Sequence, residues 1–121
     1  MSPAVAGARR ALVVEDEILV AMYIEDLLTD LGFEVVALAT DLDQALPVAR
    51  EGAFDVAVLD VNLSGRASFP VAEVLRERRI PFLFASGYGS RGLLERWRDA
   101  VRIQKPFRGE DLAAAIRRAT G

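Results

Sequence analysis

The 121-residue sequence contains no cysteine and no histidine. Without cysteine, the chain cannot form a disulfide framework or a thiolate metal site. Without histidine, it cannot bind a metal through imidazole, build a Ser-His-Asp triad or carry a phosphohistidine. Any reactive site must therefore rely on carboxylate, hydroxyl, amide or ammonium groups.

Lysine is almost absent as well. Fourteen of the fifteen basic residues are arginine, and Lys105 is the only lysine. The neutral interpretation is a mutational bias toward arginine. Under such a bias, a retained lysine marks a position where a compact ammonium group does what a planar guanidinium does not.

Long apolar segments are also missing. No run approaches the roughly 20 residues that span a bilayer, and residues 1–7 lack the apolar centre of a signal peptide. We therefore expect a cytoplasmic protein with no membrane partner. The net charge of −3 argues against nucleic acid as a partner.

The composition is that of one globular domain, with 52% hydrophobic and 27% charged residues. We expect residues 1–9 to form a flexible tail and residues 10–121 to form the domain. Because only two residues follow the last predicted helix, we expect no output domain.

Short apolar runs alternate with segments of helical periodicity along the chain. The pattern predicts strands at 11–14, 34–39, 54–59, 80–85 and 101–104. It predicts helices at 18–31, from Asp41 onward, within 67–79 starting near Pro70, at 90–100 and at 109–119. Gly32 should end the first helix, and Pro47 should kink or shorten the second. This alternation predicts an α/β fold with a parallel sheet and helices on both faces.

Polar side chains follow the predicted strands at their carboxyl ends, where open parallel sheets place their functional groups. Glu15 and Asp16 follow the first strand, Asp60 the third, Ser86 the fourth and Lys105 the fifth. We therefore expect three carboxylates, a hydroxyl and an ammonium group to converge at one edge of the sheet.

Such a cluster requires positive charge. Two carboxylates about 4 Å apart repel by roughly 4 kcal/mol at an effective dielectric constant near 20. Lys105 offsets part of this repulsion, and a hard divalent cation such as Mg²⁺, which prefers oxygen ligands, would offset the rest. Asp60 would then be a carboxylate nucleophile toward phosphorus, with Ser86 and Lys105 holding the phosphoryl oxygens.

In these segments the sequence resembles the response-regulator receiver family, from Leu12 to Ala119. The resemblance rests on four motifs in order: residues 13–17 (VVEDE), 58–63 (VLDVNL), 85–87 (ASG) and 105–107 (KPF). It implies a flavodoxin-like (βα)5 doubly wound parallel sheet with strand order 2-1-3-4-5. It also implies a single-domain response regulator that receives a phosphoryl group from a sensor histidine kinase or a histidine phosphotransfer protein and signals to a protein target, or acts as a phosphate sink.

The resemblance also implies residue roles. Asp60 accepts the phosphoryl group and, with Asp16 and the backbone carbonyl of Asn62, ligates Mg²⁺. Glu15 acts on the metal through a water molecule. Ser86 is the switch hydroxyl, and Lys105 contacts the phosphoryl group. The domain assists its own phosphorylation and dephosphorylation and is otherwise not an enzyme.

Three positions depart from the usual receiver pattern. Glu15 replaces the commoner aspartate. Arg102 occupies the position of the aromatic residue that rotates on activation, three residues before the lysine. Residues 81–89 (PFLFASGYG) are similar to the FATGUY subgroup of single-domain receivers, in which Tyr88 takes over part of the switching. Asn62 and Tyr88 are the residues expected to set the lifetime of the phosphorylated state.

Three alternatives remain open. A phosphorylation-independent receiver-like module would bind proteins without using the site. A haloacid-dehalogenase-like phosphatase needs an aspartate two residues after its nucleophile, where this chain has Asn62. A flavodoxin needs a phosphate-binding loop after the first strand, where this chain is acidic.

Overall fold

The computed structural model describes residues 9–87 and 92–121 of the chain. Within these residues the main feature is a parallel sheet of five strands in the order β2-β1-β3-β6-β7. Its strands are β1 (Arg9–Val14), β2 (Phe33–Ala39), β3 (Val56–Asp60), β6 (Phe82–Ser86) and β7 (Arg102–Gln104). Counted along the sheet-forming strands alone, this is the expected order 2-1-3-4-5, so the doubly wound α/β prediction is confirmed.

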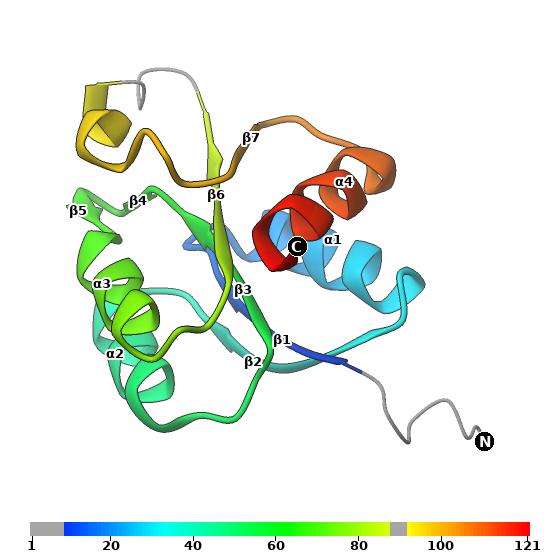
Figure 1. The fold of residues 1–121 in the computed structure, drawn as a ribbon, viewed down its shortest axis with the longest axis horizontal. Coiled ribbons are helices and arrows are strands. Elements are labelled where there is room, and N and C mark those ends of the chain that lie inside the picture. The colour runs from blue at the N-terminus through cyan, green and yellow to red at the C-terminus, as the bar shows by residue number, and fades with distance from the viewer. Residues whose placement is uncertain (1–8, 88–91) are drawn as a thin grey trace.

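Helices cover both faces of the sheet, as Figure 1 shows, with α1 and α4 on one side and α2 and α3 on the other. They are α1 (Ile18–Asp30), α2 (Leu42–Glu51), α3 (Phe69–Glu77) and α4 (Gly109–Thr120). A short 3₁₀ helix, η2 (Gly92–Trp97), precedes β7. The polar ends of the strands therefore lie at an edge of the sheet between two helical layers.

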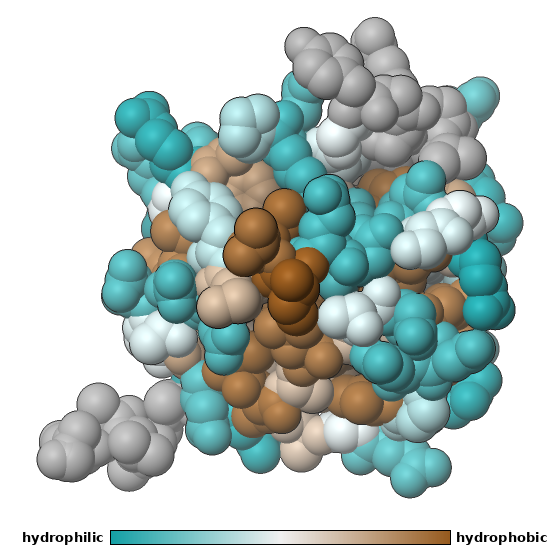
Figure 2. Space-filling model, turned by 180° about the vertical axis from the view of Figure 1, so that it is seen from behind, coloured by the Kyte–Doolittle hydropathy of each residue, from teal (hydrophilic) through white to brown (hydrophobic). Residues whose placement is uncertain are grey.

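The first turns of α1 expose apolar side chains to solvent. Leu19 is 77% exposed, and Ile18, Met22 and Tyr23 are each about half exposed. Seen from behind, the molecule shows apolar surface running down the middle of this face (Figure 2). The apolar start of α1 directly follows the acidic segment at the end of β1.

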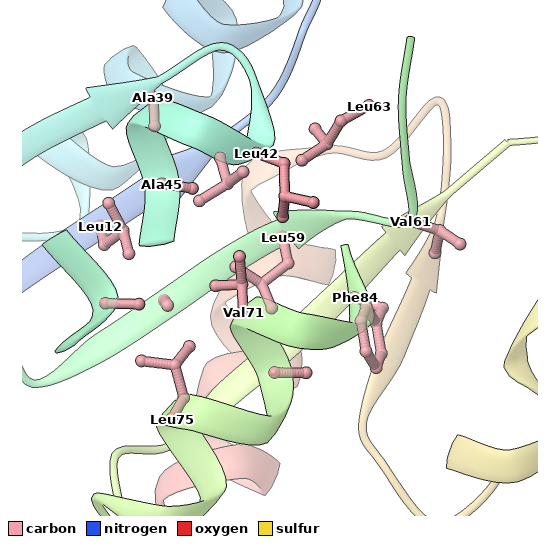
Figure 3. Close-up of a cluster of buried hydrophobic side chains, with 14 of the residues drawn as sticks. Leu12, Ala39, Leu42, Ala45, Leu59, Val61, Leu63, Val71, Leu75 and Phe84 are labelled. Carbon is pink, nitrogen blue, oxygen red and sulfur yellow. The ribbon is translucent and has the colours of Figure 1, made fainter. Parts of the chain in front are cut away.

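The core consists of two apolar layers, one on each face of the sheet. In the layer under α2 and α3, Leu12 and Leu59 from the strands meet Leu42, Val71 and Leu75 from the helices (Figure 3). The layer under α1 and α4 contains Val13, Val58, Ile24, Leu28 and Leu112. Strands buried on both faces produce the continuous apolar runs seen in the sequence.

Local signals explain where the helices begin and end. Gly32 follows α1 with a φ of +93°, a conformation that glycine adopts without strain. The Asp41 carboxylate accepts a hydrogen bond from the Gln44 N–H (2.8 Å) at the start of α2. Pro47 was expected to kink or shorten α2; the helix does not end at Pro47 but continues for four residues beyond it to Glu51.

Other boundaries also needed correction. Arg9 belongs to β1, not to a tail, because β1 pairs with β2 from Arg9 onward. The third strand starts at Val56 rather than Phe54 and includes Asp60. The helix predicted for residues 90–100 is, in its described part, the short 3₁₀ helix η2. A segment this short gains too few hydrogen bonds to offset the cost of starting an α-helix, so packing decides its shape.

The sequence interpretation missed a hairpin between β3 and α3. Strands β4 (Asn62–Leu63) and β5 (Arg66–Ala67) pair antiparallel across a two-residue turn. Ser64 and Gly65 form this turn with φ values of 55° and 91°. Positive φ at both turn residues matches the type I′ turn that suits tight hairpins. The hairpin fixes the chain just after Asp60.

Candidate functional site

Three carboxylates gather at the carboxyl ends of β1 and β3, as the sequence predicted. Glu15, Asp16 and Asp60 each offer an oxygen atom, and these oxygens lie within 4.8 Å of one another. Val14 pairs with Leu59 in the sheet, so the residues that follow the two strands become neighbours. Parallel register is therefore what converts two distant sequence motifs into one acidic cluster.

Lys105 provides the positive charge of the cluster. Its Nζ atom donates to Oε1 of Glu15 at 2.7 Å and lies 3.3 Å from Oδ1 of Asp60. Burial alone would lower the pKa of Lys105, but the hydrogen bond and charge of Glu15 and the charge of Asp60 raise it above its usual value. The ammonium group therefore stays protonated at neutral pH.

Asp60 is the most strongly perturbed carboxylate of the site. Only 8% of its surface is exposed. Burial raises the pKa of Asp60 to about 7, and the negative charge of Glu15 adds to the rise, while Lys105 counteracts it. A buried carboxylate with a strongly shifted pKa beside a lysine is typical of a reactive group.

Glu15 is completely buried. Its Oε2 atom accepts a hydrogen bond from the Glu17 N–H (3.1 Å), and its Oε1 atom accepts from Lys105. Each oxygen of Glu15 thus has a protein donor. The longer glutamate at this position of the sequence reaches the lysine directly.

Asp16 is held by the hairpin that follows β3. Its Oδ2 atom accepts hydrogen bonds from the backbone N–H (2.9 Å) and the hydroxyl (3.1 Å) of Ser64. Burial by itself would raise the pKa of Asp16, but these bonds and those shared with Asp60 and Glu15 hold it below its usual value. At neutral pH Asp16 is therefore ionised, whereas Asp60 is only partly ionised.

Ser64 was missed by the sequence interpretation. The signal was present, because a Ser-Gly dipeptide is a common turn former and here separates two short strand segments. The sequence does not show that this turn donates a hydrogen bond to Asp16, which lies 48 residues away along the chain.

Ser86 and Asn62 lie at the same edge of the sheet. Ser86 ends β6, one residue beyond Ala85, which pairs with Asp60. Its backbone oxygen accepts from the Lys105 N–H at 2.8 Å, which fixes the lysine beside β6. The Asn62 side chain is exposed and accepts from the Gly65 N–H at 2.8 Å, so it stabilises the hairpin turn.

The expected switch positions have different outcomes. Arg102 begins β7, pairs with Phe84 and is exposed. The sequence position from which receivers normally switch therefore carries an arginine instead of an aromatic residue. Tyr88 lies outside the described residues, and its role stays a prediction. The peptide bond between Lys105 and Pro106 is cis.

The model of the response regulator receiver domain family matches residues 11–117, nearly the whole chain. The chain belongs to this family. Among sequence relatives, the receiver domain is 34% identical over 115 residues to the transcriptional regulatory protein PdtaR of Mycobacterium tuberculosis. That match covers 92% of this chain and 56% of PdtaR, so the chain spans little more than half the length of this relative.

Solved structures agree with this assignment. The solution structure of SdrG from Sphingomonas melonis Fr1 matches with a TM-score of 0.81 and 42% identity, covering 96% of this chain and 98% of SdrG. The receiver domain of the sensor histidine kinase PA1611 from Pseudomonas aeruginosa matches with a TM-score of 0.79 and 26% identity over 94% of this chain and 98% of its own. That structure has a magnesium ion coordinated in its active site cleft.

The donor set of the acidic cluster fits the same ion. Glu15, Asp16 and Asp60 supply carboxylate oxygens, which are the ligands that Mg²⁺ prefers. When all three carboxylates are ionised, their negative charge exceeds the single positive charge of Lys105, so a divalent cation would complete the charge balance and favour this ionised state. In the described part of the chain, no helix is long and apolar enough to cross a membrane.

Proposed function

We propose that this receiver domain is the phosphoacceptor of a two-component phosphorelay and that Asp60 carries the phosphoryl group. The observation behind the proposal is the position of Asp60: it ends a central strand, lies within reach of two other carboxylates and has the Lys105 ammonium group 3.3 Å away. Receiver membership supports the class of chemistry, and the geometry supports the choice of residue.

In the proposed reaction, an Asp60 carboxylate oxygen attacks the phosphorus of a donor phosphohistidine. An O–P bond forms, the N–P bond breaks, and the donor imidazole leaves with the electron pair. The phosphohistidine must lie outside these 121 residues, because they contain no histidine. Lys105 is placed to contact a phosphoryl oxygen, and Ser86 supplies a hydroxyl from the neighbouring strand.

Mg²⁺ would be held by Asp16 and Asp60, with the Asn62 carbonyl as a third ligand. When bound, it would favour the ionised form of Asp60 and neutralise charge on the phosphoryl oxygens. Both carboxylate oxygens of Glu15 accept hydrogen bonds within the protein, Oε1 from Lys105 and Oε2 from the Glu17 N–H. Its proposed task is therefore to keep the lysine in place as well as to add charge.

The partner of this chemistry is proposed to be a histidine kinase or a histidine phosphotransfer protein. The exposed apolar side chains at the start of α1 support a protein donor, because they stand next to Asp16 and its cluster. The downstream event is proposed to be a phosphorylation-dependent protein interaction or a phosphate-sink role. The proposed chemistry is limited to the domain's own phosphorylation and dephosphorylation, so the chain is proposed not to be an enzyme in any other respect.

The test is phosphorylation by acetyl phosphate with Mg²⁺, measured as intact protein mass. Wild type should gain one phosphoryl group, and Asp60→Asn should gain none. Asp26→Asn, which neutralises an exposed aspartate on α1, should label like wild type and serves as the matched control. Labelling of Asp60→Asn to the wild-type extent would overturn the site. A folded wild type that neither labels nor binds Mg²⁺ would favour the phosphorylation-independent module.

A further inference from the structure

The hairpin after β3 is firmly anchored next to the acidic cluster. Leu63 on β4 is 1% exposed and belongs to the core layer under α2 and α3. After the hairpin, the Ser68 N–H donates to the Val61 carbonyl at 2.8 Å, so the chain returns to the point where it left β3. The turn at Ser64 and Gly65 is therefore fixed relative to Asp60.

The donors of this turn point at residues of the site. The backbone N–H and hydroxyl of Ser64 both bind Oδ2 of Asp16, at 2.9 and 3.1 Å. The Gly65 N–H binds the side-chain oxygen of Asn62 at 2.8 Å. Two donors on one oxygen fix the rotation of the Asp16 carboxylate and leave its second oxygen outside these bonds.

We propose that Ser64 is a positioning residue that orients the Asp16 carboxylate for a divalent cation. It would act through Asp16 without touching the cation, as hydrogen-bonding partners of metal ligands do. The inference rests on the proposed function, because it requires the acidic cluster to bind Mg²⁺. It assigns a site role to a hairpin that would otherwise be a simple connection between β3 and α3.

Ser64→Gly isolates the hydroxyl. Glycine accepts the φ of 55° and keeps the backbone N–H, so the turn and one of the two hydrogen bonds should remain. Loss of the partner of a metal ligand typically weakens metal binding about 10–100-fold. Because Ser64 is exposed and one bond survives, we expect Mg²⁺ affinity to fall by about tenfold or slightly less.

Gly65→Ala perturbs the turn as a whole and has a close control. Both Gly65 and Gly32 have φ values above 90°, and an added Cβ would meet nothing within 4 Å at either position. Alanine therefore introduces the same backbone strain in the hairpin and at the end of α1. Gly65→Ala should weaken Mg²⁺ binding, whereas Gly32→Ala should lower the melting temperature similarly and leave Mg²⁺ affinity unchanged.

The measurement is calorimetric titration of unphosphorylated protein with MgCl₂, together with the melting temperature of each variant without metal. Weaker Mg²⁺ binding by Ser64→Gly and Gly65→Ala, with Gly32→Ala equal to wild type, supports the inference. Wild-type affinity in both hairpin variants overturns it while leaving the proposed metal site intact. No Mg²⁺ binding by folded wild type overturns the metal site itself, and the inference with it.

Discussion

The ammonium group of Lys105 lies closer to Glu15 than to Asp60, with Nζ 2.7 Å from Oε1 of Glu15 and 3.3 Å from Oδ1 of Asp60. Glu15 is fully buried, so it depends on this lysine for compensation of its charge. Asp60 is the second partner of the same ammonium group, and its ionised form is correspondingly less stabilised. A phosphoryl group on Asp60 would bring more negative charge and compete with Glu15 for Lys105.

Lys105→Met should destabilise the fold because it leaves Glu15 buried without a cation. Removing one partner of a buried ion pair costs about 3–5 kcal/mol, and we expect the lower part of this range because Lys105 remains 21% exposed. Adding Glu15→Gln should recover part of the loss. Urea unfolding of the two single variants and the double variant measures the coupling, and strictly additive effects would contradict a dependence of Glu15 on Lys105.

Asp60 should make stability fall as pH rises from acidic to neutral. Folding raises the pKa of Asp60 from 3.8 to about 7, so the folded chain holds a proton that the unfolded chain has lost. The folded state binds more protons in this window, and its stability therefore decreases with pH. Asp60→Asn should stabilise the metal-free protein by about 1–3 kcal/mol at pH 8 and by little at pH 4.

Thermal unfolding across this pH range, in the presence of a chelator, checks the prediction. Asp26→Asn is the control, since it removes an exposed carboxylate and should change stability little at any pH. Saturating Mg²⁺ should stabilise wild type more than Asp60→Asn, because binding to the folded state alone adds stability. An equal gain for Asp60→Asn at both ends of the pH range would show that Asp60 does not titrate in this window.

Trp97 should matter for stability through its ring, not through its N–H. The side chain is 4% exposed, and its Nε1 atom has no hydrogen-bond partner within the described part of the chain. Its ring packs against three other aromatic rings, those of Phe69, Phe82 and Phe84. The guanidinium carbon of Arg76 lies 4.4 Å from its centroid.

Trp97→Ala should therefore cost about 3–5 kcal/mol, as expected for an aromatic residue removed from a core. Trp97→Phe should cost less than about 2 kcal/mol, because it keeps the ring contacts and removes a buried donor that lacks a partner. Urea unfolding followed by circular dichroism is the measurement. A Phe variant as unstable as the Ala variant would mean that the indole N–H finds a partner in solution.

The exposed start of α1 should affect phosphotransfer from a protein but not from a small molecule. Leu19→Ser removes an apolar side chain that is 77% exposed, so the fold should be unaffected. Labelling by acetyl phosphate should stay at the wild-type rate. Transfer from a phosphorylated histidine phosphotransfer protein should slow about tenfold, the effect of losing between 1 and 2 kcal/mol of contact energy.

Leu31→Ser is the matched control for this prediction. Leu31 is also an exposed leucine, at 37%, but it lies at the far end of α1 from the acidic cluster. Its substitution should leave both labelling rates unchanged. Equal slowing by both variants would show that the start of α1 is no preferred contact.

The local elements and the identity of the reactive residues could be predicted from the sequence. Apolar runs such as residues 11–14 and 54–59 indicated buried strands, because strands covered on both faces are continuously apolar. Gly32 and Asp41 marked helix ends through their own backbone and side-chain chemistry. Asp60 and Lys105 could be selected because each directly follows a predicted strand.

The sequence determined which groups meet, since parallel strands bring their carboxyl ends to one edge whatever the details of the loops. Only the tertiary structure decided how those groups are paired. Lys105 lies closer to Glu15 than to Asp60, and Ser64 donates to Asp16. The two hydrogen-bonded pairs are separated by 90 and 48 residues of sequence, so local sequence signals do not determine these contacts. Likewise, η2 takes its shape from packing around Trp97, because short segments have too little local preference to fix their own conformation.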